Sequence, residues 1–180
     1  DALDNAANRF IIGLGGSATT DCGAGMLAGL GVKWLAADGS ELAPNPAALA
    51  DLDRADLSGL DPRLADVEID LACDVTNPLL GPHGSAAVFG PQKGAGPDDV
   101  RYLDGILEKV AEALVAAGAP DVREEPGAGA AGGLGAAARF MLDGALTARL
   151  SRSLPTATLV INVLGSFLLG LVTGGIDDGA

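Results

Sequence analysis

The chain has 180 residues and a formal net charge of −13, with 48% hydrophobic but only 3% aromatic residues. This length suits one domain or a domain and a half. Nucleic acid is excluded as a partner, because phosphate backbones need lysine and arginine and unpaired bases stack on aromatic rings.

The two cysteines, Cys22 and Cys73, lie too far apart in sequence for a metal-binding motif. We expect both to be buried, reduced thiols. Together with the acidic charge and the lack of a signal peptide, they predict a cytoplasmic protein.

Residues 10–26 predict a strand, a glycine turn and the start of a helix. The apolar run Phe10–Leu14 is typical of a parallel strand covered on both faces. Gly15 and Gly16 would let the backbone approach a ligand, and Ser17 would offer a cap or ligand oxygen near a helix start that attracts anions. Asp21 would hold Mg²⁺ bridging to phosphate. A plain strand-to-helix turn is the alternative, because the glycine spacing matches neither the G-x-G-x-x-G motif nor the Walker A loop, which needs Gly-Lys-Ser/Thr.

The next elements are shorter. A helix is predicted over residues 20–30 with Gly31 as its stop, followed by a strand over 32–35 and a hairpin turn at Asp38–Gly39. Residues 41–66 show little periodicity and predict a loop with short helical turns around 46–52.

Residues 67–74 predict a strand that ends at Asp74, where open α/β sheets place ligand groups. Loops follow at 75–82 and, after a short apolar piece, at 90–94, which contains Lys93. From the residues alone, Asp74 is a ligand group or a loop cap, and Lys93 is a binding cation or a surface lysine.

A long helix is predicted to begin at Pro97, because apolar residues from Val100 to Leu114 recur at steps of three and one. Gly118 and Pro120 end it. The glycine cluster 127–135 is either a flexible linker or a second phosphate-facing turn. Residues 153–176 carry no charge and predict a membrane helix, or a segment packed on a sheet edge.

Five motifs resemble the type 1 bacterial glycerate kinases: IIGLGGSATTDCGAGM (11–26), LSGLDPRL (57–64), ACDVTNPLLGPHG (72–84), VFGPQKGA (88–95) and PGAGAAGGLGAA (126–137). The resemblance implies a two-domain α/β enzyme that transfers the γ-phosphoryl group of ATP to glycerate with Mg²⁺. This chain would form an incomplete version of that fold. The family pattern has Gly where this chain has Cys22.

The resemblance implies roles for several residues. Asp74 or Asp21 would accept the glycerate hydroxyl proton or hold Mg²⁺, and Lys93 would offset anionic charge. Gly15, Gly16, Ser17 and Asn77 would bind substrate or nucleotide. Whether the 2- or the 3-hydroxyl group is phosphorylated stays open.

A second resemblance covers residues 132–174. The strings GGLGAAARFMLDGAL (132–146) and PTATLVINVLGSFLLGLVTG (155–174) are similar to the first two helices of the small bacterial fluoride channels, with Arg139 and Asn162 on matching positions. We therefore divide the chain into a kinase-like part, 1–131, and a hydrophobic part, 132–180, with a C-terminal hydrophobic helix. The alternatives to a kinase fragment are a channel-type protein of the bacterial inner membrane, touching lipid through 153–176, and a non-functional fusion.

Overall fold

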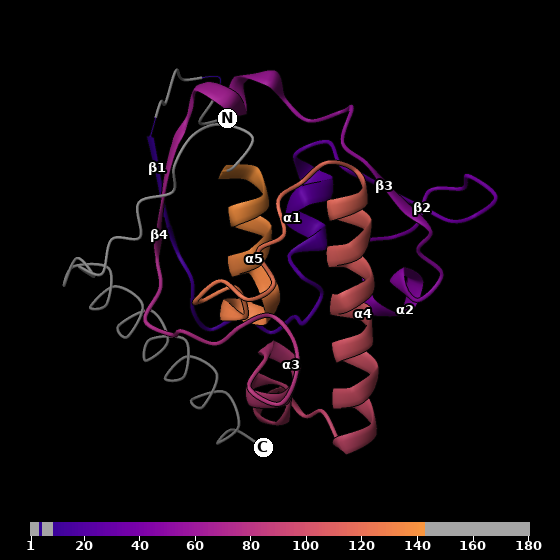
Figure 1. The fold of residues 1–180 in the computed structure, drawn as a ribbon, viewed down its shortest axis with the longest axis vertical. Coiled ribbons are helices and arrows are strands. Elements are labelled where there is room, and N and C mark those ends of the chain that lie inside the picture. Colours follow the sequence, from indigo (N-terminus) through magenta and orange to yellow (C-terminus); the bar gives the residue numbers. More distant parts are fainter. Residues whose placement is uncertain (1–3, 5–8, 143–180) are drawn as a thin grey trace, which may run out of the picture.

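The computed structural model describes residue 4 and residues 9–142, which form two small sheets and several helices (Figure 1). The strands are β1 (Arg9–Gly13) and β4 (Glu68–Ala72), which pair in parallel, and β2 (Lys33–Leu35) and β3 (Arg54–Asp56), which pair antiparallel. The helices are α1 (Ala24–Gly29), α2 (Pro46–Leu49), α3 (Ser85–Phe89), α4 (Pro97–Ala116) and α5 (Ala130–Leu142), with 3-10 turns η1 (Pro62–Asp66) and η2 (Pro91–Lys93).

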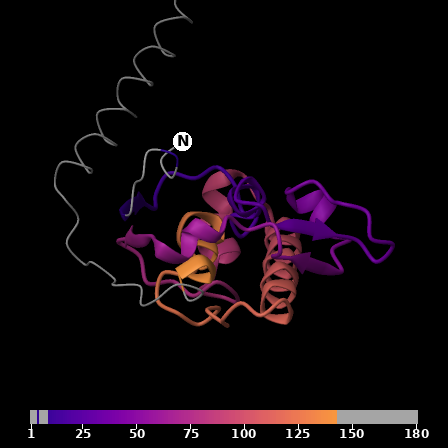
Figure 2. The same cartoon turned by 90° about the horizontal axis from the view of Figure 1, so that it is seen from above.

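The two sheets lie on opposite sides of the helices. Figures 1 and 2 show the β1–β4 sheet beside α5, and the β2–β3 sheet with α2 on the far side of α4. The predicted α/β class is therefore confirmed for the described residues.

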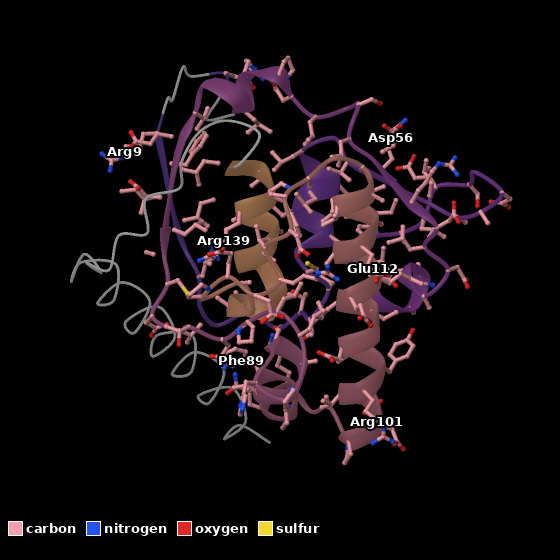
Figure 3. The ribbon with its side chains drawn as sticks, in the orientation of Figure 1. Arg9, Asp56, Phe89, Arg101, Glu112 and Arg139 are labelled. Atoms are coloured by element: carbon pink, nitrogen blue, oxygen red, sulfur yellow. The ribbon has the colours of Figure 1, made fainter. Side chains whose placement is uncertain are left out.

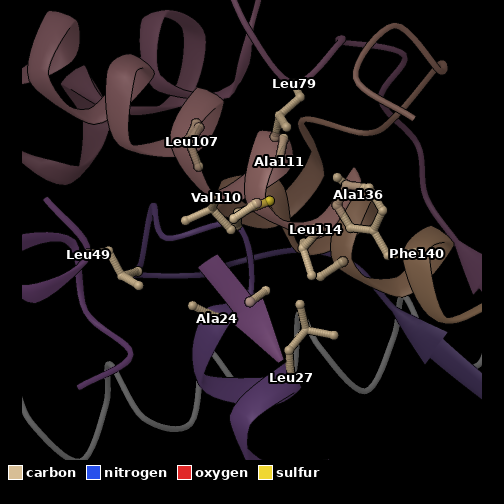
Figure 4. Packing of buried hydrophobic residues seen from close by; sticks show 14 of the residues in the cluster. Ala24, Leu27, Leu49, Leu79, Leu107, Val110, Ala111, Leu114, Ala136 and Phe140 are labelled. Carbon is tan, nitrogen blue, oxygen red and sulfur yellow. The ribbon is translucent and has the colours of Figure 1, made fainter. Parts of the chain in front are cut away.

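Helix α4 forms as its periodicity predicts. Its Pro97 is the first helical residue, and the Asp99 carboxylate accepts a hydrogen bond of 2.9 Å from the Gly96 N–H group just before it. The apolar face is buried in the main core, where Leu107, Val110 and Leu114 belong to the same cluster as residues of α1 and α5 (Figure 4). The helix thus joins the two halves of the fold.

Strand β1 differs from its prediction of cover on both faces. Its inner face, Phe10 and Ile12, packs with β4 and α5 residues, but Ile11 on the outer face is 61% exposed. On that outer face Arg9 forms an ion pair with Asp70 of β4. An apolar run alone could not show that, among the described residues, helices cover this strand on one face only.

Two other segments also differ from the sequence prediction. The first helix begins at Ala24 rather than at residue 20, and β3 forms within the predicted loop 41–66. The short apolar piece at 86–89, for which the sequence predicted no secondary structure, is part of α3. The predicted apolar helix over 153–176, with Asn162, lies outside the described residues. Among residues 9–142, no helix is long and apolar enough to cross a membrane.

Candidate functional site

A pocket of about 250 Å³ opens where the loops after β1 and β4 meet η2 and the start of α5. Because β1 and β4 are parallel, their carboxyl ends bring these two loops to one edge of the sheet. The lining residues are Leu14, Gly15, Gly16, Ser17, Asp74, Val75, Phe89, Gln92, Lys93, Ala131 and Gly132.

The loop after β1 presents bare backbone to this pocket. Gly16 has a φ of +63°, and a Cβ atom at Gly15 or Gly16 would meet no protein atom within 4 Å. The space beside these two glycines is therefore open to a ligand. The loop runs on to residue 23, so the helix begins at Ala24, four residues after its predicted start at residue 20. With six residues, α1 is too short to act as the anion-binding helix end.

The second glycine cluster forms a wall of the same pocket. A Cβ atom at Gly132 would lie 2.0 Å from the Thr19 carbonyl oxygen, and the Cys22 N–H group donates to the Gly132 carbonyl at 3.1 Å. Ala131, Gly132 and Gly133 all have positive φ angles. Of the two sequence interpretations, the flexible linker is therefore wrong for residues 130–133, because only glycine permits this backbone contact.

Lys93 ties the two sides of the pocket together. From η2, its ammonium group donates to the Ser17 hydroxyl at 3.1 Å and to the Thr19 carbonyl at 2.5 Å, and lies 3.5 Å from the Thr20 hydroxyl. Burial lowers the pKa of Lys93, and the nearby Asp21 carboxylate opposes this shift. Among the residues that the structure describes, Lys93 is the single cationic side chain on the pocket lining.

The two predicted acidic residues have different environments. Asp74 is exposed, lines the pocket, and has no hydrogen-bond or ion-pair partner among the described residues. Asp21 is 8% exposed and lies outside the pocket lining. Its carboxylate accepts a hydrogen bond of 3.0 Å from the Gly23 N–H group. Burial raises the pKa of Asp21, which hydrogen bonds and the Lys93 charge partly offset.

Two other predicted residues, Asn77 and Arg139, are not part of the lining. The Asn77 side-chain amide donates to the His83 carbonyl at 2.8 Å and closes the loop after β4. Arg139 is buried in α5, where its guanidinium group donates to the Gly135 carbonyl at 3.0 Å. Asn162 lies outside the described residues.

Sequence reasoning missed several lining residues, notably Phe89 and Gln92. Figure 3 labels Phe89 on α3, below the pocket loops. The sequence position of Gln92 could have indicated it as a lining residue, because Gln92 directly precedes Lys93 in the same tight loop. Within residues 9–142, no group of three or more acidic, histidine or cysteine side chains is arranged to hold a metal ion. Asp74 alone would give Mg²⁺ one carboxylate, which fits an ion that takes its other ligands from phosphate and water.

Comparison with known proteins shows the family to which this chain belongs. Residues 1–165 match the model of the "Glycerate kinase family". The chain is 47% identical over 162 residues to the glycerate 2-kinase of Escherichia coli K12, covering 90% of this chain and 42% of that protein. It is 52% identical over 134 residues to the glycerate kinase of Bacillus subtilis 168, covering 74% of this chain and 35% of that protein.

A solved structure agrees. The crystal structure of a Salmonella typhimurium LT2 protein assigned as glycerate kinase 2 superposes with a TM-score of 0.77 at 46% identity, covering 84% of this chain and 39% of that one. The chain thus spans less than half the length of these relatives. Nothing in the comparisons supports the fluoride-channel resemblance of residues 132–174. The family match instead runs through residue 165, and Arg139 lies in an α5 packed against β4.

Proposed function

The chain belongs to the glycerate kinase family, and we propose that it forms the part of such an enzyme that binds glycerate and the triphosphate of ATP. One observation carries the proposal. The pocket combines open backbone at Gly15 and Gly16, the ammonium group of Lys93, and the Asp74 carboxylate, which has no partner within residues 9–142. Phosphoryl transfer needs these features, because its catalysis is mainly positioning and charge stabilisation.

Each group has a distinct proposed role. Asp74 accepts the proton of the glycerate hydroxyl group while the hydroxyl oxygen forms a bond to the γ-phosphorus of ATP. The bond between that phosphorus and the bridging oxygen breaks, and ADP leaves. Lys93 and the backbone N–H groups near Gly15 and Gly16 stabilise the negative charge on the transferring group. Mg²⁺, when bound beside Asp74, would neutralise phosphate charge.

The remaining predicted residues support the site from outside. We propose that Asp21 and Asn77 shape the two loops rather than touch the substrate, since their polar atoms bond to the loops' own backbone. The name of the Escherichia coli relative, glycerate 2-kinase, favours the 2-hydroxyl group as the acceptor.

The test is glycerate-dependent release of ADP by the purified 180-residue chain with Mg–ATP, with the product identified by phosphorus NMR. Asp74→Asn should lower the rate about 10²–10⁴-fold, the usual contribution of a general base. Asp98→Asn, at an exposed carboxylate on α4, is the control and should keep the full rate. ADP release that ignores glycerate, or that is equal in Asp74→Asn, would contradict the proposal.

A further inference from the structure

Arg139 is a buried cation for which the proposed reaction has no use. It is 5% exposed and forms no ion pair within residues 9–142. Its guanidinium group donates to the Gly135 carbonyl at 3.0 Å and to the Pro126 carbonyl at 2.6 Å. Burial lowers its pKa. A charge held away from water in this way costs free energy, so its contacts call for an explanation.

Those contacts lie beside Cys73 and Val75, the two neighbours of Asp74 in the chain. A Cβ atom at Gly127 would lie 3.0 Å from the Val75 carbonyl oxygen, 3.2 Å from the Cys73 sulfur and 3.3 Å from the Arg139 Nη2 atom. The Cys73 thiol also donates to the Val75 carbonyl at 3.3 Å. The guanidinium group, Gly127 and the two neighbours of Asp74 therefore pack at one point. Figure 3 shows the Arg139 side chain pointing from α5 toward the β1–β4 sheet.

We propose that Arg139 is a positioning residue, which clamps the Pro126–Gly135 segment against Cys73 and Val75 and so fixes Asp74 in the pocket wall. A planar guanidinium group suits this role because it bonds two carbonyl oxygens in fixed directions. The consequence for catalysis rests on the proposed function, whereas the clamp itself does not.

The clamp is tested by the reactivity of Cys73 toward a thiol reagent in the full chain. Cys73 is half-buried at the clamp, and the fully buried Cys22 in the main core reports global opening. Arg139→Met should speed labelling of Cys73 about tenfold more than labelling of Cys22, since hydrogen bonds to a charged group are lost locally. Arg139→Lys keeps the charge but loses the planar group that bonds two carbonyl oxygens. It should therefore increase the labelling rate of Cys73 less than Arg139→Met does.

Two further variants make the result decisive. Gly127→Ala should also expose Cys73, because its new methyl group enters the same junction at a φ of +84°. Arg123→Met is the matched control: this half-buried arginine bonds Asp121 and should leave Cys73 unchanged. Equal acceleration at both thiols, or none at Cys73 in the two folded Arg139 variants, would overturn the clamp.

A kinetic arm separates the clamp from the proposed function. If Asp74 is the proton acceptor, Arg139→Lys should lower kcat for ADP release with little change in KM. The same substitution should have almost no further effect in an Asp74→Asn background. Additive losses would contradict positioning of Asp74. Absence of glycerate-dependent turnover would contradict the proposed function. The thiol-labelling result would still show whether Arg139 holds the Pro126–Gly135 segment against Cys73 and Val75.

Discussion

The Lys93 ammonium group lies 3.1 Å from the Ser17 hydroxyl, although 76 positions separate the two residues in sequence. This contact joins η2 to the loop after β1 and sets one side of the pocket. The same ammonium group holds the Thr19 carbonyl, against which Gly132 packs. Lys93 thus joins two segments that are far apart in the sequence, and the Thr19 carbonyl that it bonds also lies against Gly132.

Replacing Lys93 by methionine should lower kcat/KM for glycerate phosphorylation by about 10²-fold, because the pocket loses its cation and the loop its anchor. The measurement is steady-state ADP release across glycerate concentrations. Lys109→Met is the control, since Lys109 on α4 bonds the Ala50 carbonyl away from the pocket. A loss of the same size in both variants would show that the Lys93 effect is not local.

Replacing Asp21 by asparagine should change how stability depends on pH. The folded pKa of Asp21 is raised above 3.8, so the folded chain binds the proton more tightly than the unfolded chain. Its contribution to stability therefore falls as pH rises from 3.8 through the raised pKa. Asp21→Asn keeps an oxygen for the Gly23 N–H group but removes this fall.

Urea unfolding of both chains between pH 3.5 and 7 measures the difference. The stability of Asp21→Asn relative to the parent should increase toward pH 7. A relative stability that decreases toward pH 7 would mean that ionised Asp21 is net stabilising, through its attraction to Lys93.

Gly31→Ala should destabilise the fold by roughly 2–5 kcal/mol. The φ of Gly31 is +109°, and a Cβ atom there would lie 1.9 Å from the Gly59 carbonyl oxygen. Gly39→Ala is the matched control, because Gly39 also has a positive φ, +85°, but its nearest neighbour would be 3.8 Å away. It should cost about 1 kcal/mol in the same denaturant experiment. Equal costs would mean that backbone strain, not the contact with Gly59, dominates at Gly31.

Local patterns predicted the parts of the fold that local forces determine. The periodic apolar face of α4 and the stop at Gly31 needed no knowledge of distant contacts. The alternating strand ending near Asp74 also placed that carboxylate at the pocket, because the carboxyl ends of parallel strands share an edge.

Distant contacts determined what the sequence could not show. The sequence predicted a loop where β3 forms, because a strand of three residues is too short to show an alternating pattern. Its pairing with β2 and its packing on α4 determine its structure. The sequence predicted Asp21 as a ligand but could not show that packing of the surrounding loop leaves it 8% exposed and outside the pocket lining, so its ligand role stays a prediction. Cys22 adopts a φ of 58°, where glycine is favoured, so the departure from the family pattern falls on a residue with a demanding backbone.

The most direct test of the pocket is an NMR titration of the isotope-labelled chain with Mg–ADP and then glycerate. We expect little change in β2 and β3, and the largest and earliest shifts at the pocket, in the amide signals of Gly15, Gly16, Ser17, Asp74 and Lys93. Signals that stay unchanged at saturating ligand, or that shift mainly around the β2–β3 sheet, would contradict it.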